Sequence, residues 1–170
     1  MKRHPALQDL SRDHHHFLLQ CRNIRWCVEG DRRALPFEVV LRGFLRTWEQ
    51  EVVPHLEEEE TLFLPFYRRY ASPLQAQHEA QIRADHEFLR MNVAELMRMQ
   101  EAGEPIEALL SDIGRKLHDH VRFEERLVFK HVQTIMSDEA LSELGAMSLA
   151  LRQATRPNAI GPRKEEVCEV

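Results

Sequence analysis

The sequence predicts an all-α protein, an up-down-up-down antiparallel four-helix bundle with a short additional C-terminal helix. Apolar residues recur at spacings of three and four over long stretches, and no stretch alternates apolar and polar residues as a strand would. The breaks between these stretches contain proline or glycine and are short. Because short connections join antiparallel neighbours, the long helices are expected to pack side by side in chain order.

The first helix is expected to begin at Pro5, since proline is favoured in the first turn, and to end at Glu29-Gly30-Asp31. One face of this helix carries a seam, meaning residues spaced alternately by three and four that would face the core. A histidine stands in this apolar seam, which comprises Leu7, Leu10, His14, Phe17, Cys21, Ile24 and Val28.

The second helix is expected to open near Pro36 and to end before the turn Ala71-Ser72-Pro73. Pro54 removes one backbone hydrogen bond within it, which predicts a kink, and Pro65 predicts a second kink or the start of the helix end. The seam of this helix contains a histidine and a glutamate: Leu41, Leu45, Trp48, Val52, His55, Glu59, Leu62 and Phe66.

The third helix is expected between Pro73 and Ala102-Gly103, and the fourth begins at Glu104-Pro105. Both seams again contain histidine. The third seam comprises Ile82, His86, Leu89, Val93 and Leu96, and the fourth comprises Ile106, Leu110, Ile113, Leu117, His120, Glu124, Leu127 and His131.

A shorter helix is expected from about Ser137, a suitable N-cap residue, to about Arg152. The segment that follows contains prolines, a glycine and the charged run Arg163-Lys164-Glu165-Glu166, so it has little to bury. We therefore expect one domain over residues 1–152 and an extended or disordered tail over residues 153–170.

Composition excludes several classes of function. The net charge of −5 and the lack of a Lys/Arg-rich run argue against nucleic acid as a partner. No apolar run approaches the ~18 residues that span a bilayer, and the N-terminus lacks the apolar segment of a signal peptide. The three cysteines form no CxxC pair, which suits a reducing cytoplasm. The sequence does not decide between a monomer and a homodimer.

The four seam histidines are expected to lie at nearly one level of the bundle, because each is a similar number of residues from its nearest turn and a helix rises about 1.5 Å per residue. His55 and Glu59 are one helical turn apart, and His120 and Glu124 repeat this spacing. Buried carboxylates without a partner are costly, and a cation removes that cost. The candidate metal ligands are His14, His55, Glu59, His86, His120 and Glu124.

Imidazole and carboxylate together suit iron, manganese or zinc better than calcium or magnesium. Two carboxylates that can bridge favour a pair of metal ions. Of the acidic run, only Glu59 is clearly expected to point inward; Glu58 is undecided, and Glu57 and Glu125 are expected off the seam. His15 is a fallback ligand, while His16, His78, His118 and His131 are expected to serve no metal.

The chain resembles the hemerythrin-like, or HHE cation-binding, domain family over residues 5–135. The resemblance lies in Leu10-Ser11-Arg12-Asp13-His14-His15, in His55-x3-Glu59-Glu60, in Ala84-Asp85-His86 and in His120-x3-Glu124-Glu125. It implies a non-haem di-iron centre, bridged by two carboxylates, that binds or reacts with dioxygen, nitric oxide or peroxide.

One position departs from the oxygen carriers of that family. They have a His-x3-His pair on the third helix, whereas this chain has Ile82 one turn before His86. One metal ion should then have a position that is open, filled by water, or taken by Glu58 or His15. This departure favours sensing or redox chemistry over reversible oxygen carriage.

Three functions follow from these observations. The preferred one is a metal-binding module that senses a small diatomic or peroxide ligand. The second is a di-iron oxidoreductase of the ferroxidase or peroxidase kind, or an iron-handling, stress-protection protein; whether the chain is an enzyme is left undecided. The third is a metal-free helical bundle that mediates protein contacts.

Overall fold

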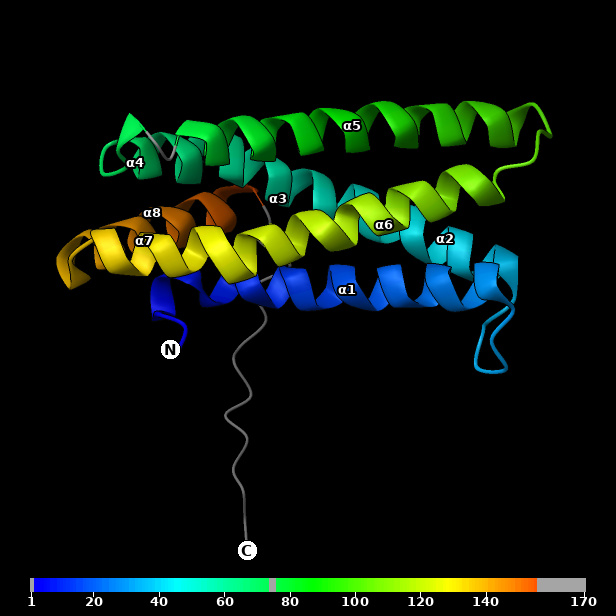
Figure 1. The fold of residues 1–170 in the computed structure, drawn as a ribbon, viewed down its shortest axis with the longest axis horizontal. Coiled ribbons are helices and arrows are strands. Elements are labelled where there is room, and N and C mark those ends of the chain that lie inside the picture. The colour runs from blue at the N-terminus through cyan, green and yellow to red at the C-terminus, as the bar shows by residue number, and fades with distance from the viewer. Residues whose placement is uncertain (1, 74–75, 156–170) are drawn as a thin grey trace, which may run out of the picture.

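The structure is a computed structural model that describes residues 2–73 and 76–155. Over these residues every regular element is a helix, and four long helical stretches lie side by side (Figure 1). The predicted all-α bundle with an added C-terminal helix is confirmed. Within the described part of the chain, no helix has the length and hydropathy needed to cross a bilayer.

The first stretch consists of a 3-10 turn, η1 (Pro5–Leu7), and helix α1 (Gln8–Glu29). The helix ends as the sequence predicts, because Gly30 adopts a left-handed conformation with φ of 67°. Glycine takes this conformation without the steric cost that a Cβ atom brings.

The second stretch alternates α-helical and π-helical segments: α2 (Phe37–Thr47), η2 (Trp48–Val52), α3 (Val53–Glu58), η3 (Glu59–Phe63) and α4 (Leu64–Arg68). η2 and η3 are the π-helical segments. Each is followed by an α-helical segment with a proline in its first turn. The chain therefore continues as a helix past both prolines, and the irregularity expected at Pro54 takes the form of π-helical turns just before it.

The second half of the bundle contains α5 (Ala76–Glu101), α6 (Glu107–Phe123), the π-helical segment η5 (Glu124–Val128) and α7 (Phe129–Ile135). The last three form one continuous stretch, whose π-helical segment occupies the position that η3 has in the second stretch. Both η3 and η5 begin at a seam glutamate. π-Helical turns of this kind are frequent at functional sites.

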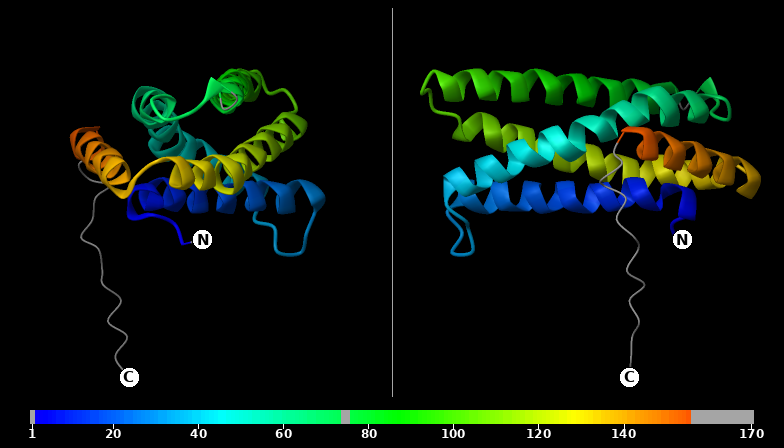
Figure 2. Two further views of the ribbon diagram at one scale, coloured as in Figure 1. Left: turned by 60° about the vertical axis from the view of Figure 1, so that its left-hand side comes forward. Right: turned by 180° about the vertical axis from the view of Figure 1, so that it is seen from behind.

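Helix α8 (Asp138–Thr155) follows, and the Ser137 hydroxyl accepts a hydrogen bond from the Ala140 amide at its start. It lies outside the bundle and contacts η1 and η3 (Figure 2). The close approach to η1 depends on Gly145, where a Cβ atom would come within 3.1 Å of the Ala6 backbone. Residues 153–155, which were predicted to belong to the tail, are helical, and the rest of the predicted tail, residues 156–170, lies outside the described residues.

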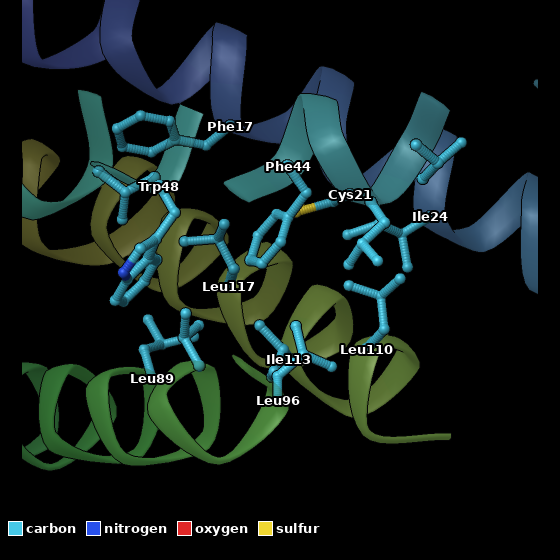
Figure 3. Packing of buried hydrophobic residues seen from close by; sticks show 14 of the residues in the cluster. Phe17, Cys21, Ile24, Phe44, Trp48, Leu89, Leu96, Leu110, Ile113 and Leu117 are labelled. Atoms are coloured by element: carbon cyan, nitrogen blue, oxygen red, sulfur yellow. The ribbon is translucent and has the colours of Figure 1, made fainter. Parts of the chain in front are cut away.

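The core has two apolar clusters separated by a polar layer. One cluster, shown in Figure 3, includes Phe17, Leu89 and Leu117. The other includes Phe63 and Ile82. Along every long stretch the seam histidine or glutamate lies between residues of these two clusters, which places the candidate ligands in the polar layer.

Candidate metal centre

The six predicted ligand residues come from all four long stretches and meet in the polar layer. None is more than 1% exposed. Each is held by a regular helical segment: His14 by α1, His55 by α3, Glu59 by η3, His86 by α5, His120 by α6 and Glu124 by η5. The ligand atoms therefore depend on helix packing rather than on loops for their positions.

These residues form two overlapping groups that share both glutamates: His14, His55, Glu59 and Glu124, and Glu59, His86, His120 and Glu124. Within each group, one ligand atom from each residue lies within 4.8 Å of the others. Each group could hold one metal ion with two imidazoles and two carboxylates, so the two groups offer the same set of donors.

The oxygens of Glu59 are divided between the two groups. Oε1 lies 3.2 Å from His55 Nε2, and Oε2 lies 3.2 Å from His86 Nε2. Glu124 makes the matching contacts through one oxygen, since Oε2 lies 3.1 Å from His14 Nε2 and 3.5 Å from His120 Nε2. Both carboxylates thus stand where they can bridge a pair of cations.

The buried polar atoms at this centre lack the hydrogen bonds that a folded protein normally provides. All four carboxylate oxygens of Glu59 and Glu124 are buried and accept no hydrogen bond with suitable geometry, and Nε2 of His86 and of His120 has no such partner. Buried polar groups are nearly always satisfied, and an unsatisfied carboxylate is especially costly. A pair of cations at this position would satisfy these atoms together.

Each candidate histidine turns its other ring nitrogen toward a second carboxylate. Nδ1 lies at hydrogen-bond distance in three of them, 2.9 Å for His14 to Glu125, 3.0 Å for His55 to Asp13 and 2.7 Å for His86 to Glu60. The fourth, His120 Nδ1, lies 3.6 Å from Asp85, which is too far for a hydrogen bond. A carboxylate in this position fixes the ring orientation and the tautomer that leaves Nε2 free to bind metal. This arrangement is typical of histidines that ligate metal ions.

Every one of these outer carboxylates has a basic partner: Arg3 for Glu125, Arg152 for Asp13, Arg90 for Glu60 and Lys116 for Asp85. The outer negative charges are therefore balanced by fixed side chains. Among residues 2–73 and 76–155, no lysine or arginine forms an ion pair with Glu59 or Glu124, whose partners are histidines. The negative charge of these two carboxylates is therefore the charge that bound cations would balance.

Charge coupling shifts the pKa values in this layer. Burial would lower the pKa of His55, but the charge of Glu59 and the hydrogen bond to Asp13 outweigh it and raise that pKa to about 10. Burial opposes ionisation of Glu59 as well, yet the charges of His55 and His86, whose Nε2 atoms lie 3.2 Å from its oxygens, hold its pKa well below the usual range. A metal ion that binds His55 therefore displaces a proton.

Neither Glu58 nor His15, the two side chains considered for the position left by Ile82, belongs to the two groups. Glu58 is buried, but it accepts hydrogen bonds from Ser148 at 2.5 Å and from Arg152 at 3.1 Å, away from the two groups. His15 is exposed and lines a groove of about 710 Å³ between α1 and α6. Ile82 itself is fully buried in the second apolar cluster.

The remaining histidines take no part in the two groups. His78 is buried next to Tyr67, with 2.9 Å between the phenol oxygen and Nδ1, and its ring lies 5.9 Å from that of His131. His16 and His118 are exposed and pair with Glu51 and Asp119.

Glu125, predicted off the seam, and Glu60, for which the sequence predicted no role, both contact candidate ligands. Glu60, Glu125 and Asp13 are partly buried and Asp85 is buried, each next to a candidate ligand. The sequence suggested no role for Asp13 or Asp85. The sequence does contain a pattern that identifies these four carboxylates. Each is the immediate neighbour of a seam His or Glu on its own helix, as in Asp13-His14 and Glu59-Glu60.

Comparison with known proteins gives one match. The model of the hemerythrin HHE cation binding domain family matches residues 6–132. The matched region includes all six candidate ligands and ends before α8. No curated protein and no solved structure matches.

Proposed function

Because the chain belongs to the hemerythrin HHE cation-binding domain family, we propose that it holds a carboxylate-bridged pair of iron ions that binds or senses dioxygen, nitric oxide or peroxide. The proposed ligands are His14, His55 and Glu59 from the first half of the chain, and His86, His120 and Glu124 from the second. Zinc and manganese are the alternative metals for this donor set.

The observation that carries the proposal is the set of buried carboxylate oxygens that accept no hydrogen bond. A bundle that served only as a scaffold would gain stability by replacing Glu59 and Glu124 with apolar residues. Their burial between four imidazoles is expected of a site whose binding energy for cations offsets the cost of burying charge.

A sensing role is supported by the four protein ligands of each group. Iron commonly accepts more ligands than this, so each ion would keep a position for a small molecule. The same open positions support the second candidate, a ferroxidase or peroxidase. The bound metals would supply the redox chemistry, while the chain positions them, keeps them apart from bulk water and holds the charge balance.

The test is to purify the protein anaerobically with ferrous iron, measure metal content, and record optical spectra as dioxygen, nitric oxide or hydrogen peroxide is added. We expect about two iron ions per chain, one for each ligand group, and a spectrum that changes with at least one of these ligands. Sustained consumption of peroxide or of added ferrous iron would favour the oxidoreductase. A folded protein that takes up no metal would overturn the proposal and support the metal-free bundle.

The domain limits of 1–152 and a cytoplasmic location stay predictions.

A further inference from the structure

Arg152 is a buried cation at the end of α8, in a part of the chain that the family match does not cover. Its side chain is 10% exposed, compared with 38% for Arg90 and 34% for Lys116 in the matching positions. Burying a guanidinium requires carboxylates close by. Arg152 has two of them, and they come from different helical stretches.

The first carboxylate is Asp13, which Arg152 contacts through both terminal nitrogens, at 2.8 Å from Nη2 to Oδ2 and 3.3 Å from Nη1 to Oδ1. The same Oδ2 lies 3.0 Å from His55 Nδ1. One oxygen of Asp13 thus connects α8 to a candidate metal ligand.

The second carboxylate is Glu58, whose Oε2 lies 2.8 Å from Arg152 Nε. Glu58 directly precedes the proposed bridging residue Glu59 and is 3% exposed, so it is a buried carboxylate near the metal layer. Arg152 and Ser148, both on α8, hold it away from the two ligand groups. Arg152 therefore contacts Glu58 through Nε and Asp13 through its two terminal nitrogens, so one planar guanidinium fixes the positions of both carboxylates.

We propose that Arg152 is a positioning residue of the metal centre: through Asp13 it fixes the ring of His55, and it keeps Glu58 from becoming a competing ligand. Helix α8 then positions residues of the metal centre, in addition to packing against the bundle. The proposal rests on the proposed metal site.

The test uses the full-length protein and cobalt(II), whose visible absorption reports ligand number and geometry. The variants are Arg152→Met, which removes the charge and keeps an unbranched side chain, and Arg152→Lys, which keeps the charge but cannot contact both carboxylates with a planar fork. The matched control is Leu144→Ala, because Leu144 is buried in α8 and contacts the apolar cluster instead of the polar layer. Circular dichroism establishes that each protein is folded.

We expect Arg152→Met to bind cobalt about tenfold to a hundredfold more weakly than the parent, as loss of support for a metal-binding histidine typically does, and to show an altered cobalt spectrum. Arg152→Lys should recover part of the affinity. Leu144→Ala should lower the melting temperature while keeping the parental spectrum and nearly the parental affinity.

Parental affinity and spectrum in Arg152→Met would overturn the proposal. An equal loss in Leu144→Ala would also overturn it, since α8 would then act only through general stability. If Arg152→Met does not fold, Arg152→Lys decides: an unchanged spectrum and affinity would reject the positioning role. A parent protein that binds neither cobalt nor iron would instead contradict the proposed function.

Discussion

Glu59 and Glu124 are the residues on which the proposed metal pair depends most, because each stands between histidines of both ligand groups. Replacing either by alanine should reduce bound metal from about two ions per chain to fewer than one, since both ions lose a ligand. Glu57→Ala is the matched control, because Glu57 lies in the same acidic run but is exposed. Metal analysis after gel filtration makes the comparison, and equal losses at positions 57 and 59 would refute the assignment. Glu125 cannot serve as a control, because it contacts His14.

Cys21 provides a second prediction at the scale of the residue. Burial raises the pKa of its thiol to about 12 from a usual value of 9.0. At pH 8 and below, the thiol is almost entirely neutral in both the folded and the unfolded chain. Between pH 9 and 12 the unfolded chain loses this proton first, so the free energy of unfolding should fall as pH rises, by about 2 kcal/mol at pH 10.5 from this group alone.

Urea unfolding at pH 8 and at pH 10.5 measures this loss, and Cys21→Ala is the control that isolates it. The variant should be less stable than the parent at pH 8, because it loses a buried side chain, but should lose less stability on going to pH 10.5. Equal pH dependence in the two proteins would show that the thiol is not shielded from water.

At the scale of the element, the two halves of the chain share one local arrangement around η3 and η5. In each half a histidine lies in the last turn of an α-helical segment, and a glutamate is the first residue of the π-helical segment that follows. A π-helical turn bonds each amide one residue further back than an α-helix does. It therefore changes the direction in which side chains leave the helix. Glu59 and Glu60, like Glu124 and Glu125, can then both serve the centre, one toward the metal position and one toward a histidine.

The packing of α1 against α6 gives a prediction on helix contacts. A Cβ atom added at Gly114 would lie 3.1 Å from Ile24 Cγ2, and Ile24 is only 1% exposed, so it has little room to move. Gly114→Ala gains about 1 kcal/mol in helix propensity but should lose more through overpacking, for a net loss of about 1 kcal/mol.

Gly43→Ala is the control within α2, where the nearest atom is Gln20 Oε1 at 3.6 Å, an ordinary contact. It should stabilise the protein by about 0.5 to 1 kcal/mol. Urea midpoints of the two variants give the comparison. A stabilising effect of similar size at both positions would mean that α1 and α6 are farther apart than described.

At the scale of the whole molecule, the proposed metal pair would connect all four long stretches at the layer between the two apolar clusters. Ligands that bind only the folded state stabilise it by about 3 to 4 kcal/mol at a hundred to a thousand times the dissociation constant. Chelation should therefore lower the melting temperature by about 5 to 15 °C for a chain of this size. Calorimetry with and without chelator measures the shift, and a double variant, Glu59→Ala with Glu124→Ala, should show none. A parent whose melting temperature does not change on removal of its metal would contradict the prediction.

The sequence alone determined the helices and the level at which their polar residues meet. The spacing of apolar residues specified the seams, Gly30 and Gly103 marked helix ends, and His55-x3-Glu59 with His120-x3-Glu124 indicated the buried donors. These features follow from the regular geometry of a helix, in which the interval between two residues fixes both their separation along the axis and their common face.

Only the tertiary structure decided which groups support those donors. Arg152 lies 139 residues from Asp13, and no helical period relates the two. The sequence left Glu58 undecided as a ligand, and its hydrogen bonds to Ser148 and Arg152 depend on where α8 packs. Glu60 and Glu125 likewise became partners of His86 and His14 through π-helical turns and helix packing. Contacts between distant segments depend on how the helices dock, which local spacing does not encode.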